Sequence, residues 1–416
     1  MTTNKKNNNT VNSLFNSIQF NSIQFNSICN NFKLVLGIII AGIIILYSCR
    51  SYTGPIKRGN NDLNDEEDNY FETVNNCIIP ALTVTKNNTL IAAIGDKNNE
   101  GKILIKTSKD GGTNWTSYSG NIKNDDITTG FAHPFFINCY NGDILLGIAT
   151  TNESENVVSF YRSTTEGSSW TKENAKIEMP QKTINQLNKE LIPQHAFATY
   201  GNGLALKHGT NTNTLLFLYY YKDTSDSGAM STMISTDNGA SWKRHGKDQG
   251  VYSSYGAKFI EIENGNILYF LNGSAGIAWF KSANQGESET LSQSFYKSSK
   301  GSPIYADFVR YEFNGQDISN KTKHVLVAFS EGYTGYKVMM SMDDFKEGKK
   351  DTQIIGSAAK VVGTSSEYHD IYPAITVLRD GTIATLAAED YDIIFRSFDL
   401  AYLSNAETNT YKVKLW

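Results

Sequence analysis

Short apolar runs recur along the chain, and each follows a turn that usually contains Asn, Asn-Gly or Asp-Gly. Six of them can be read in order: NNTLIAAI, NGDILLGI, NTNTLLFLYY, NGNILYFL, TKHVLVAF and RDGTIATLA. A turn that leads into a short apolar run is typical of an antiparallel hairpin. Because the runs are apolar at nearly every position, they predict strands that are buried on both faces between neighbouring sheets.

A second pattern follows the first five runs: a partly alternating strand that ends in Ser and leads into a turn. The strands are KILIKTS, VVSFYRS, MSTMIS, AWFKS and KVMMS. The most complete turns contain Ser108, Asp110, Gly112 and Trp115; Ser163, Gly167 and Trp170; and Ser235, Asp237, Gly239 and Trp242. In such a turn Gly supplies a positive φ, the Asp carboxylate accepts backbone N–H groups, and the Trp ring packs beneath the hairpin. The motif therefore predicts a structural turn rather than a site of chemistry.

The two patterns together repeat with a period of roughly 50 residues, which is typical of propeller architectures. Six repeats with several strands each predict an all-β fold, a six-bladed β-propeller, over residues 75–416. The composition agrees, because 12% aromatic residues and abundant Asn, Ser and Thr favour strands and turns.

Charge and metal-ligand patterns exclude several functions. The net charge is −4 and no strongly basic patch occurs, so nucleic acid is not expected as a partner. The six His residues are scattered without paired spacing, so neither a metal site nor a cofactor is expected. Beyond the N-terminal segment only Cys77 and Cys139 remain, either as free thiols or as one disulfide.

The N-terminus has the pattern of a targeting segment. Residues 1–49 contain an Asn-rich tract and then Lys33, followed by a sixteen-residue uncharged run that ends at Cys49. The run has the length of a signal-peptide core, and its last four residues resemble a bacterial lipobox with Cys49 as the acylated residue. An uncleaved signal anchor is the alternative. Residues 50–74 then form an acidic tether, so we expect a membrane-anchored protein, a bacterial lipoprotein, on the extracytoplasmic side.

The Asp-Gly-Trp turns resemble the Asp boxes (BNR repeats) of the sialidase superfamily. Three further segments are similar to that family in the same order: CIIPALTVTKNNTLIAAIGDK, GAKFIEIENGNILYFLN and EYHDIYPAITVLRDGTIATLAAEDYDIIFRSFDLAYL. The resemblance implies a six-bladed propeller with Asp boxes far from the active site. It also implies sialoside hydrolysis by a Tyr nucleophile paired with a Glu, an acid/base Asp, and three Arg that bind the substrate carboxylate.

Carried over residue by residue, the resemblance gives Tyr372 as the candidate nucleophile. Asp96 and Glu100 are the candidates for the acid/base, and Lys97 falls at an Arg position as a substrate-binding candidate. A phenol, with a pKa of about 10, is a poor nucleophile until a base removes its proton. His369, three residues before Tyr372, is an alternative base.

Several positions depart from the family pattern. Ile78 stands at the first Arg position and Gly256 at the Glu position. Ala388, with Glu389 beside it, stands where a Glu would support the first Arg. Bidentate guanidinium groups bind a carboxylate best, so a chain without the Arg triad is not expected to hydrolyse sialosides efficiently. The chain has seven Arg in all: Arg50, Arg58, Arg162, Arg244, Arg310, Arg379 and Arg396.

Three functions follow as hypotheses. The first is a membrane-tethered propeller that recognises a glycan or glycoprotein ligand, including sialoglycans, at the cell surface with little or no hydrolysis. The alternative is a divergent exo-α-sialidase, a glycoside hydrolase that uses Tyr372. The second alternative is a scaffold that presents its loops to a protein partner.

Overall fold

The computed structural model describes most of the chain from residue 79 onward. The described residues are 79–96, 98–127, 132–150, 158–178, 183–184, 190–191, 195–198, 200–207, 212–222, 228–251, 258–262, 266–273, 276–283, 288–297, 305–313, 324–330, 335–341, 360–364, 371–389, 392–403 and 410–414. By its contacts the chain divides into Met1–Lys57 and Arg58–Trp416, and every described residue belongs to the second unit. The predicted targeting segment, Cys49 and the acidic tether lie outside the described residues. Within these ranges no helix is long and apolar enough to cross a membrane.

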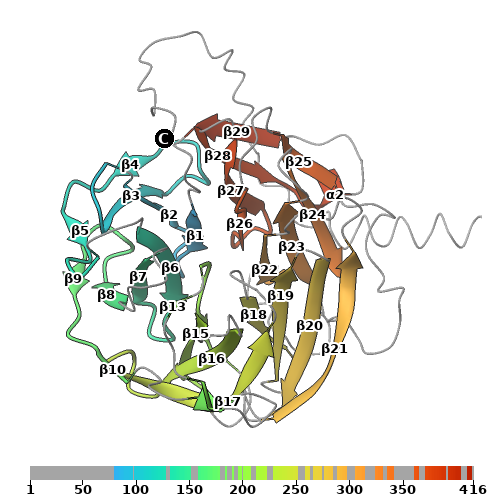
Figure 1. The fold of residues 1–416 in the computed structure, drawn as a ribbon. Coiled ribbons are helices and arrows are strands. Elements are labelled where there is room, and N and C mark those ends of the chain that lie inside the picture. The colour runs from blue at the N-terminus through green and yellow to red at the C-terminus, as the bar shows by residue number, and fades with distance from the viewer. Residues whose placement is uncertain are drawn as a thin grey trace, which may run out of the picture. The chain divides into compact units, whose positions relative to one another are not determined.

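The described residues form six sheets of four to six strands, antiparallel except where β10 (Lys176–Glu178) joins β17 (Ser241–Val251), which confirms the six-bladed β-propeller predicted from the repeats. A separate two-stranded sheet pairs β11 (Thr183–Ile184) with β12 (Glu190–Leu191). Figure 1 shows the sheets following one another around a central axis, from blue in blade 1 to red in blade 6. Each blade is built from one consecutive segment of chain. The strands nearest the axis are β1 (Ala81–Val84), β6 (Ala132–Asn138), β13 (His195–Ala198) with β14 (Leu204–Ala205), β18 (Lys258–Glu261), β22 (Ala306–Arg310) and β26 (Ala374–Val377).

The six apolar runs of the sequence are the second strands of the blades. They are β2 (Leu90–Gly95), β7 (Ile144–Thr150), β15 (Leu215–Lys222), β19 (Ile267–Gly273), β23 (Val325–Ser330) and β27 (Ile383–Glu389). In β7, Ile144, Leu146 and Ile148 pack toward blade 1, whereas Leu145 and Ala149 pack toward blade 3. Because successive side chains of a strand point to opposite faces, a strand between two blades must be apolar at consecutive positions.

The partly alternating strands that precede the turn motifs are third strands, and shorter or more irregular strands complete each blade. The third strands are β3 (Lys102–Ser108), β8 (Val158–Ser163), β16 (Gly228–Ser235), β20 (Gly276–Ala283), β24 (Gly335–Ser341) and β28 (Asp392–Phe398). The outer strands are β4 (Thr116–Ser117), β9 (Thr171–Lys172), β17 (Ser241–Val251), β21 (Ser288–Lys297), β25 (Lys360–Thr364) and β29 (Thr410–Lys414). The remaining elements are β5 (Ile122–Lys123), β10 (Lys176–Glu178), β11 (Thr183–Ile184), β12 (Glu190–Leu191) and the helix α2 (Leu400–Leu403).

The hydrophobic core is divided among the gaps between blades. Six clusters of buried side chains each join two neighbouring blades. The ring closes where Leu82 and Ala92 of blade 1 pack with Leu386 and Phe395 of blade 6. Blade 6 is therefore held to blade 1 by side-chain packing, and each blade depends on both of its neighbours for burial.

Candidate functional site

The three most complete turns share the hydrogen bonds of Ser, Gly and Trp, and Thr165 takes the place of the Asp in the second of them. At Ser235 the hydroxyl donates to Asp237 (2.7 Å) and accepts the N–H of Gly239 (2.8 Å), where φ is 93°. The Trp242 indole N–H donates to the Gly239 carbonyl (3.1 Å), and its ring stacks on Phe160 of blade 2. Gly112 and Gly167 receive the equivalent bonds to the Ser hydroxyl and the Trp indole.

The Asp237 carboxylate of this turn accepts hydrogen bonds from its own hairpin. Burial opposes the shift, but hydrogen bonds from Ser241 and Ser235 lower the pKa of Asp237 below its ordinary value. The Ser235 hydroxyl donates a hydrogen bond to the Asp237 carboxylate, so it is not positioned as a nucleophile. The geometry is that of a turn that links neighbouring blades, and it brings together no nucleophile and base.

Tyr372, the candidate nucleophile, lies in an aromatic cluster on the axis. Its ring packs against Tyr305 (centroids 3.9 Å apart) and edge-on against Tyr200 (4.9 Å), and Ile79 completes the group. Tyr372 is 7% exposed. Ile79, Tyr305 and Tyr372 stand one or two residues before the innermost strands β1, β22 and β26, and Tyr200 lies in the interruption between β13 and β14. The cluster therefore sits at the end of the axis where the innermost strands begin.

A buried ion pair joins this aromatic group. The Lys258 ammonium lies 3.4 Å from Asp307 and 4.4 Å from the centroid of the Tyr200 ring, and both charged side chains are 4% exposed. The close approach depends on Gly201, where φ is +94° and a Cβ atom would stand 1.4 Å from the Lys258 nitrogen. Burial lowers the pKa of Lys258, and the charge and hydrogen bond of Asp307 oppose that shift.

His133, near the start of β6, is the third ionisable residue of this end of the axis. Burial, together with the charge of Lys258, lowers the pKa of His133 to about 3, although a backbone hydrogen bond with Thr150 opposes the shift. The imidazole is thus neutral at physiological pH, and its Nδ1 atom is buried without a hydrogen-bond partner. We refer to His133, Tyr200, Lys258, Tyr305, Asp307 and Tyr372, with Ile79, as the axial cluster.

All five Arg of residues 75–416 are among the described residues, and none belongs to the axial cluster. Arg162 pairs with Asp143 and Glu173, and Arg396 pairs with Glu389. Arg310 and Arg379 line a cavity at the other end of the axis, and Arg244 lies in β17 of blade 3. Among the described residues, the cation of the axial cluster is Lys258, and Asp307 already compensates its charge.

The other predicted site residues are not assembled around Tyr372. The Asp96 carboxylate accepts the Asn98 N–H (3.0 Å) and pairs with Lys102 (3.2 Å), so it holds the turn between β2 and β3. Glu100 is exposed in the same turn. The candidates Ile78, Lys97, Gly256 and His369 lie outside the described residues.

Two further positions from the sequence comparison lie on opposite faces of β27. Ala388 packs between blades 6 and 1. A residue that supports the first-blade segment would also face blade 1, so the place of Ala388 agrees with the resemblance. Glu389 pairs with Arg396 of β28 in the same blade, and it lies against Gly363 of blade 5. Glu389 therefore supports the contact between blades 5 and 6.

Sequence reasoning did not find Lys258, Asp307 and His133. A signal was present: each is an ionisable residue within the first two positions of an innermost strand, before an apolar continuation. Across the described part of the chain, no group of three or more His, Cys, Asp or Glu side chains is arranged to hold a metal ion. Cys139 is a free, buried thiol whose pKa burial raises to about 11.

Comparison with known proteins shows which folds this propeller resembles. A family model described as the DUF6242 beta propeller domain matches residues 47–219, less than half of the chain. Among curated proteins, no sequence matches.

The similar solved structures include an intramolecular trans-sialidase from leech (TM-score 0.59, 14% identity, 80% of this chain and 69% of that one). The intramolecular trans-sialidase of Ruminococcus gnavus aligns with a TM-score of 0.55 and 14% identity over 79% of this chain and 95% of that one. An alpha-L-arabinanase from Penicillium chrysogenum aligns with a TM-score of 0.53 and 15% identity over 80% and 95%. The chain has the sialidase-like β-propeller fold.

Proposed function

We propose that this sialidase-like propeller is a surface-held carbohydrate-recognition protein that binds its glycan at the axial cluster and does not hydrolyse sialosides efficiently. One observation carries the proposal: the five Arg side chains of the propeller lie away from Tyr372, and the nearby Lys258 is compensated by Asp307. Because no guanidinium group of the described residues reaches the axial cluster, the described site lacks the bidentate contacts that hold a substrate carboxylate in place.

The similar structures support a carbohydrate ligand. The leech trans-sialidase is complexed with 2,7-anhydro-Neu5Ac, the Ruminococcus gnavus protein with oseltamivir carboxylate, and the arabinanase with arabinobiose. These ligands include a sialic acid derivative and a neutral disaccharide, so the fold accommodates different sugars. Tyr305, the partly exposed ring of the axial cluster, offers apolar surface to a sugar ring, and phenol hydroxyl groups can donate and accept hydrogen bonds.

Hydrolysis by Tyr372 is the second candidate, and the position of Tyr372 on the axis favours it. We expect the full chain, purified in detergent, to release no fluorophore from an α-sialoside above the rate of a Tyr372→Phe variant. Tyr118→Phe, which alters a half-buried Tyr after the outer strand of blade 1, is the matched control. Release that Tyr372→Phe abolishes and Tyr118→Phe preserves would establish the enzyme and overturn the proposal.

If no sialoside is cleaved, a glycan array separates recognition from scaffolding. Binding to a defined set of glycans that Tyr200→Ala or Tyr305→Ala weakens supports the proposed site, provided both variants keep the wild-type unfolding midpoint. A folded protein that binds no glycan on the array would favour the scaffold function.

Surface attachment through Cys49 is part of the proposal and rests on the sequence. The uncharged run after Lys33 and the lipobox-like ending indicate an acylated Cys49 followed by an acidic tether. We expect the wild-type chain to sediment with membranes in a bacterial host and to incorporate labelled palmitate. The Cys49→Ser variant should lose the label, whereas Cys29→Ser should keep it. A label that persists in Cys49→Ser contradicts the lipoprotein assignment.

A further inference from the structure

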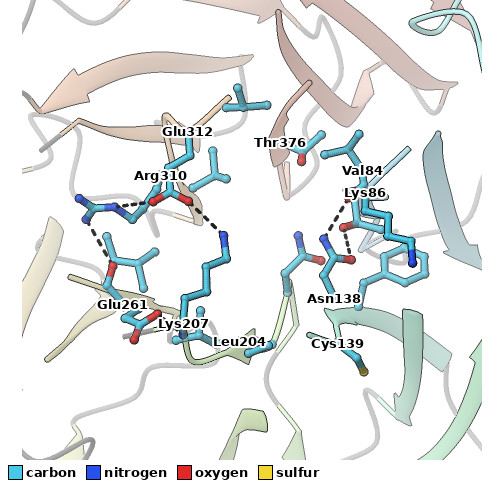
Figure 2. Close-up of a pocket in the computed structure, with 18 of the residues that line it drawn as sticks. Val84, Lys86, Asn138, Cys139, Leu204, Lys207, Glu261, Arg310, Glu312 and Thr376 are labelled. Carbon is cyan, nitrogen blue, oxygen red and sulfur yellow. Dashed lines mark hydrogen bonds and ion pairs between the residues drawn. The ribbon is translucent and has the colours of Figure 1, made fainter. Parts of the chain in front are cut away.

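A second candidate site lies at the opposite end of the axis from Tyr372. There the innermost strands end, and they surround a cavity of about 620 Å³ (Figure 2). This volume is within the range of small-molecule sites, which usually combine apolar walls with a few polar groups. Phe136, Phe259, Phe308 and Phe313 contribute apolar surface to the lining.

One wall of the cavity is a connected network of charged side chains, drawn at the left of Figure 2. Lys207 pairs with Glu312 (3.1 Å), and Glu312 lies 3.6 Å from the Arg310 guanidinium. Arg310 also donates to the Glu261 carbonyl (3.3 Å), and the Glu261 carboxylate accepts the Lys207 N–H (2.8 Å). Two cations and two carboxylates compensate one another here, so this wall adds polar groups but no net charge.

The facing wall is built from uncharged polar groups. The Thr83 hydroxyl donates to the Asn138 amide oxygen (3.0 Å), and the Asn138 amide nitrogen donates to the Val84 carbonyl (3.0 Å). Figure 2 shows Asn138 and Val84 across the cavity from the charged network. Each hydroxyl and amide keeps unused donor or acceptor capacity, which suits a ligand that carries several hydroxyl groups.

The rim adds two cations, Lys86 and Arg379, for which the described residues provide no ion pair. Lys86 donates to the Asn141 carbonyl (3.3 Å), and Arg379 is exposed. Both belong to one region of the rim, because the Arg379 N–H donates to Asn88 (2.8 Å) in the turn that carries Lys86. The lining thus has four cations and two carboxylates in a chain whose net charge is −4. The Glu166 carboxylate lies outside the lining and accepts hydrogen bonds from Thr85 and Asn87.

An exposed aromatic side chain also lines the cavity, one residue before the Lys86 contact. Tyr140 lines the cavity yet is 73% exposed, which makes it the more exposed of the two large hydrophobic side chains found at the surface of the described residues. It directly precedes Asn141, the residue that Lys86 contacts. An exposed ring at the mouth of a cavity can pack against the apolar face of a sugar ring.

We propose that this cavity binds a small sugar acid, a monosaccharide that carries a carboxylate. The carboxylate pairs with Lys86 and Arg379, the ring packs against Tyr140, and the hydroxyl groups bond to the facing walls. The site is separate from the axial cluster, and it does not depend on whether a glycan binds at Tyr372.

The test is calorimetric titration of the full chain in detergent with D-glucuronate, D-glucose and acetate at low salt. We expect glucuronate to bind at least about tenfold more tightly than either of the others, because only glucuronate has both a ring and a charge. Arg379→Gln, Lys86→Gln and Tyr140→Ala should each weaken glucuronate by about tenfold or more. Lys109→Gln, an exposed Lys outside the cavity lining, and Tyr372→Phe should leave the affinity unchanged.

Several outcomes would overturn the proposal. If glucose binds as tightly as glucuronate, the carboxylate contributes nothing to binding. If acetate binds as tightly as glucuronate, the sugar ring contributes nothing. Absence of glucuronate binding at about 10 mM, or affinity unaffected by Arg379→Gln and Lys86→Gln, would show that the cavity is not this site. Loss of binding in Tyr372→Phe would move the ligand to the axial cluster, so failure here is distinguishable from failure of the proposed function.

Discussion

Replacement of Lys258 with Met is expected to lower the free energy of unfolding by about 3–5 kcal/mol, because it leaves a buried carboxylate without its cation. Both side chains of the Lys258–Asp307 pair are 4% exposed, so water cannot replace the lost partner. Among the described residues, Asp307 would keep one hydrogen bond, from the Ile375 N–H at 3.0 Å. Urea unfolding of the full chain, followed by Trp fluorescence, measures the change.

Two further variants isolate the buried charge as the cause. Lys207→Met removes an ion pair of similar length, 3.1 Å, but its side chain is 59% exposed, so it should cost less than about 1 kcal/mol. The double variant Lys258→Met/Asp307→Asn should be more stable than Lys258→Met alone, because no uncompensated charge remains. If Lys258→Met costs no more than Lys207→Met, the pair is not held in a low-dielectric site and the argument fails.

The repeated strands of the propeller were predictable because their burial is dictated by local chemistry. A second strand such as β7 lies between two blades, so its apolar residues are consecutive and visible in the sequence. The turn at Ser235 was predictable for a similar reason, because the Gly239 N–H donates to the Ser235 hydroxyl and the Asp237 carboxylate accepts the Ser241 N–H within one hairpin. Each of these features is decided within about ten residues of chain, as turn chemistry usually is.

The axial cluster was not predictable in the same way, because its members meet only when the ring closes. Lys258 and Asp307 come from neighbouring blades, and His133 comes from blade 2. Each alone resembles a charged residue at the start of a strand. The family resemblance pointed to Gly256 and Tyr372, and Lys258 is only two residues after Gly256. When the position of Asp307 is not known, a Lys at the start of a strand is interpreted as a solvated side chain rather than a buried cation.

Acidification is expected to destabilise the protein through His133, by about 1.4 kcal/mol for each pH unit below 6.5. The pKa of His133 in the folded protein, about 3, is depressed below that of an exposed His. Between pH 6.5 and about 3 the unfolded chain therefore binds a proton that the folded chain does not. By linkage, the loss of stability caused by His133 is absent above pH 6.5 and grows as the pH falls, reaching about 3 kcal/mol near pH 4.5.

His133→Asn separates this effect from the protonation of carboxylates, which also destabilises proteins in acid. The variant loses some stability at pH 7, but its free energy of unfolding should fall less steeply than wild type between pH 6.5 and 4.5. Asn124→Ala is the matched control, because it removes a buried side chain that donates to the Ile148 carbonyl and does not titrate. Its curve should run parallel to wild type, displaced by a constant amount. If His133→Asn is also parallel to wild type, the imidazole is protonated in the folded state, and neither burial nor the charge of Lys258 depresses its pKa.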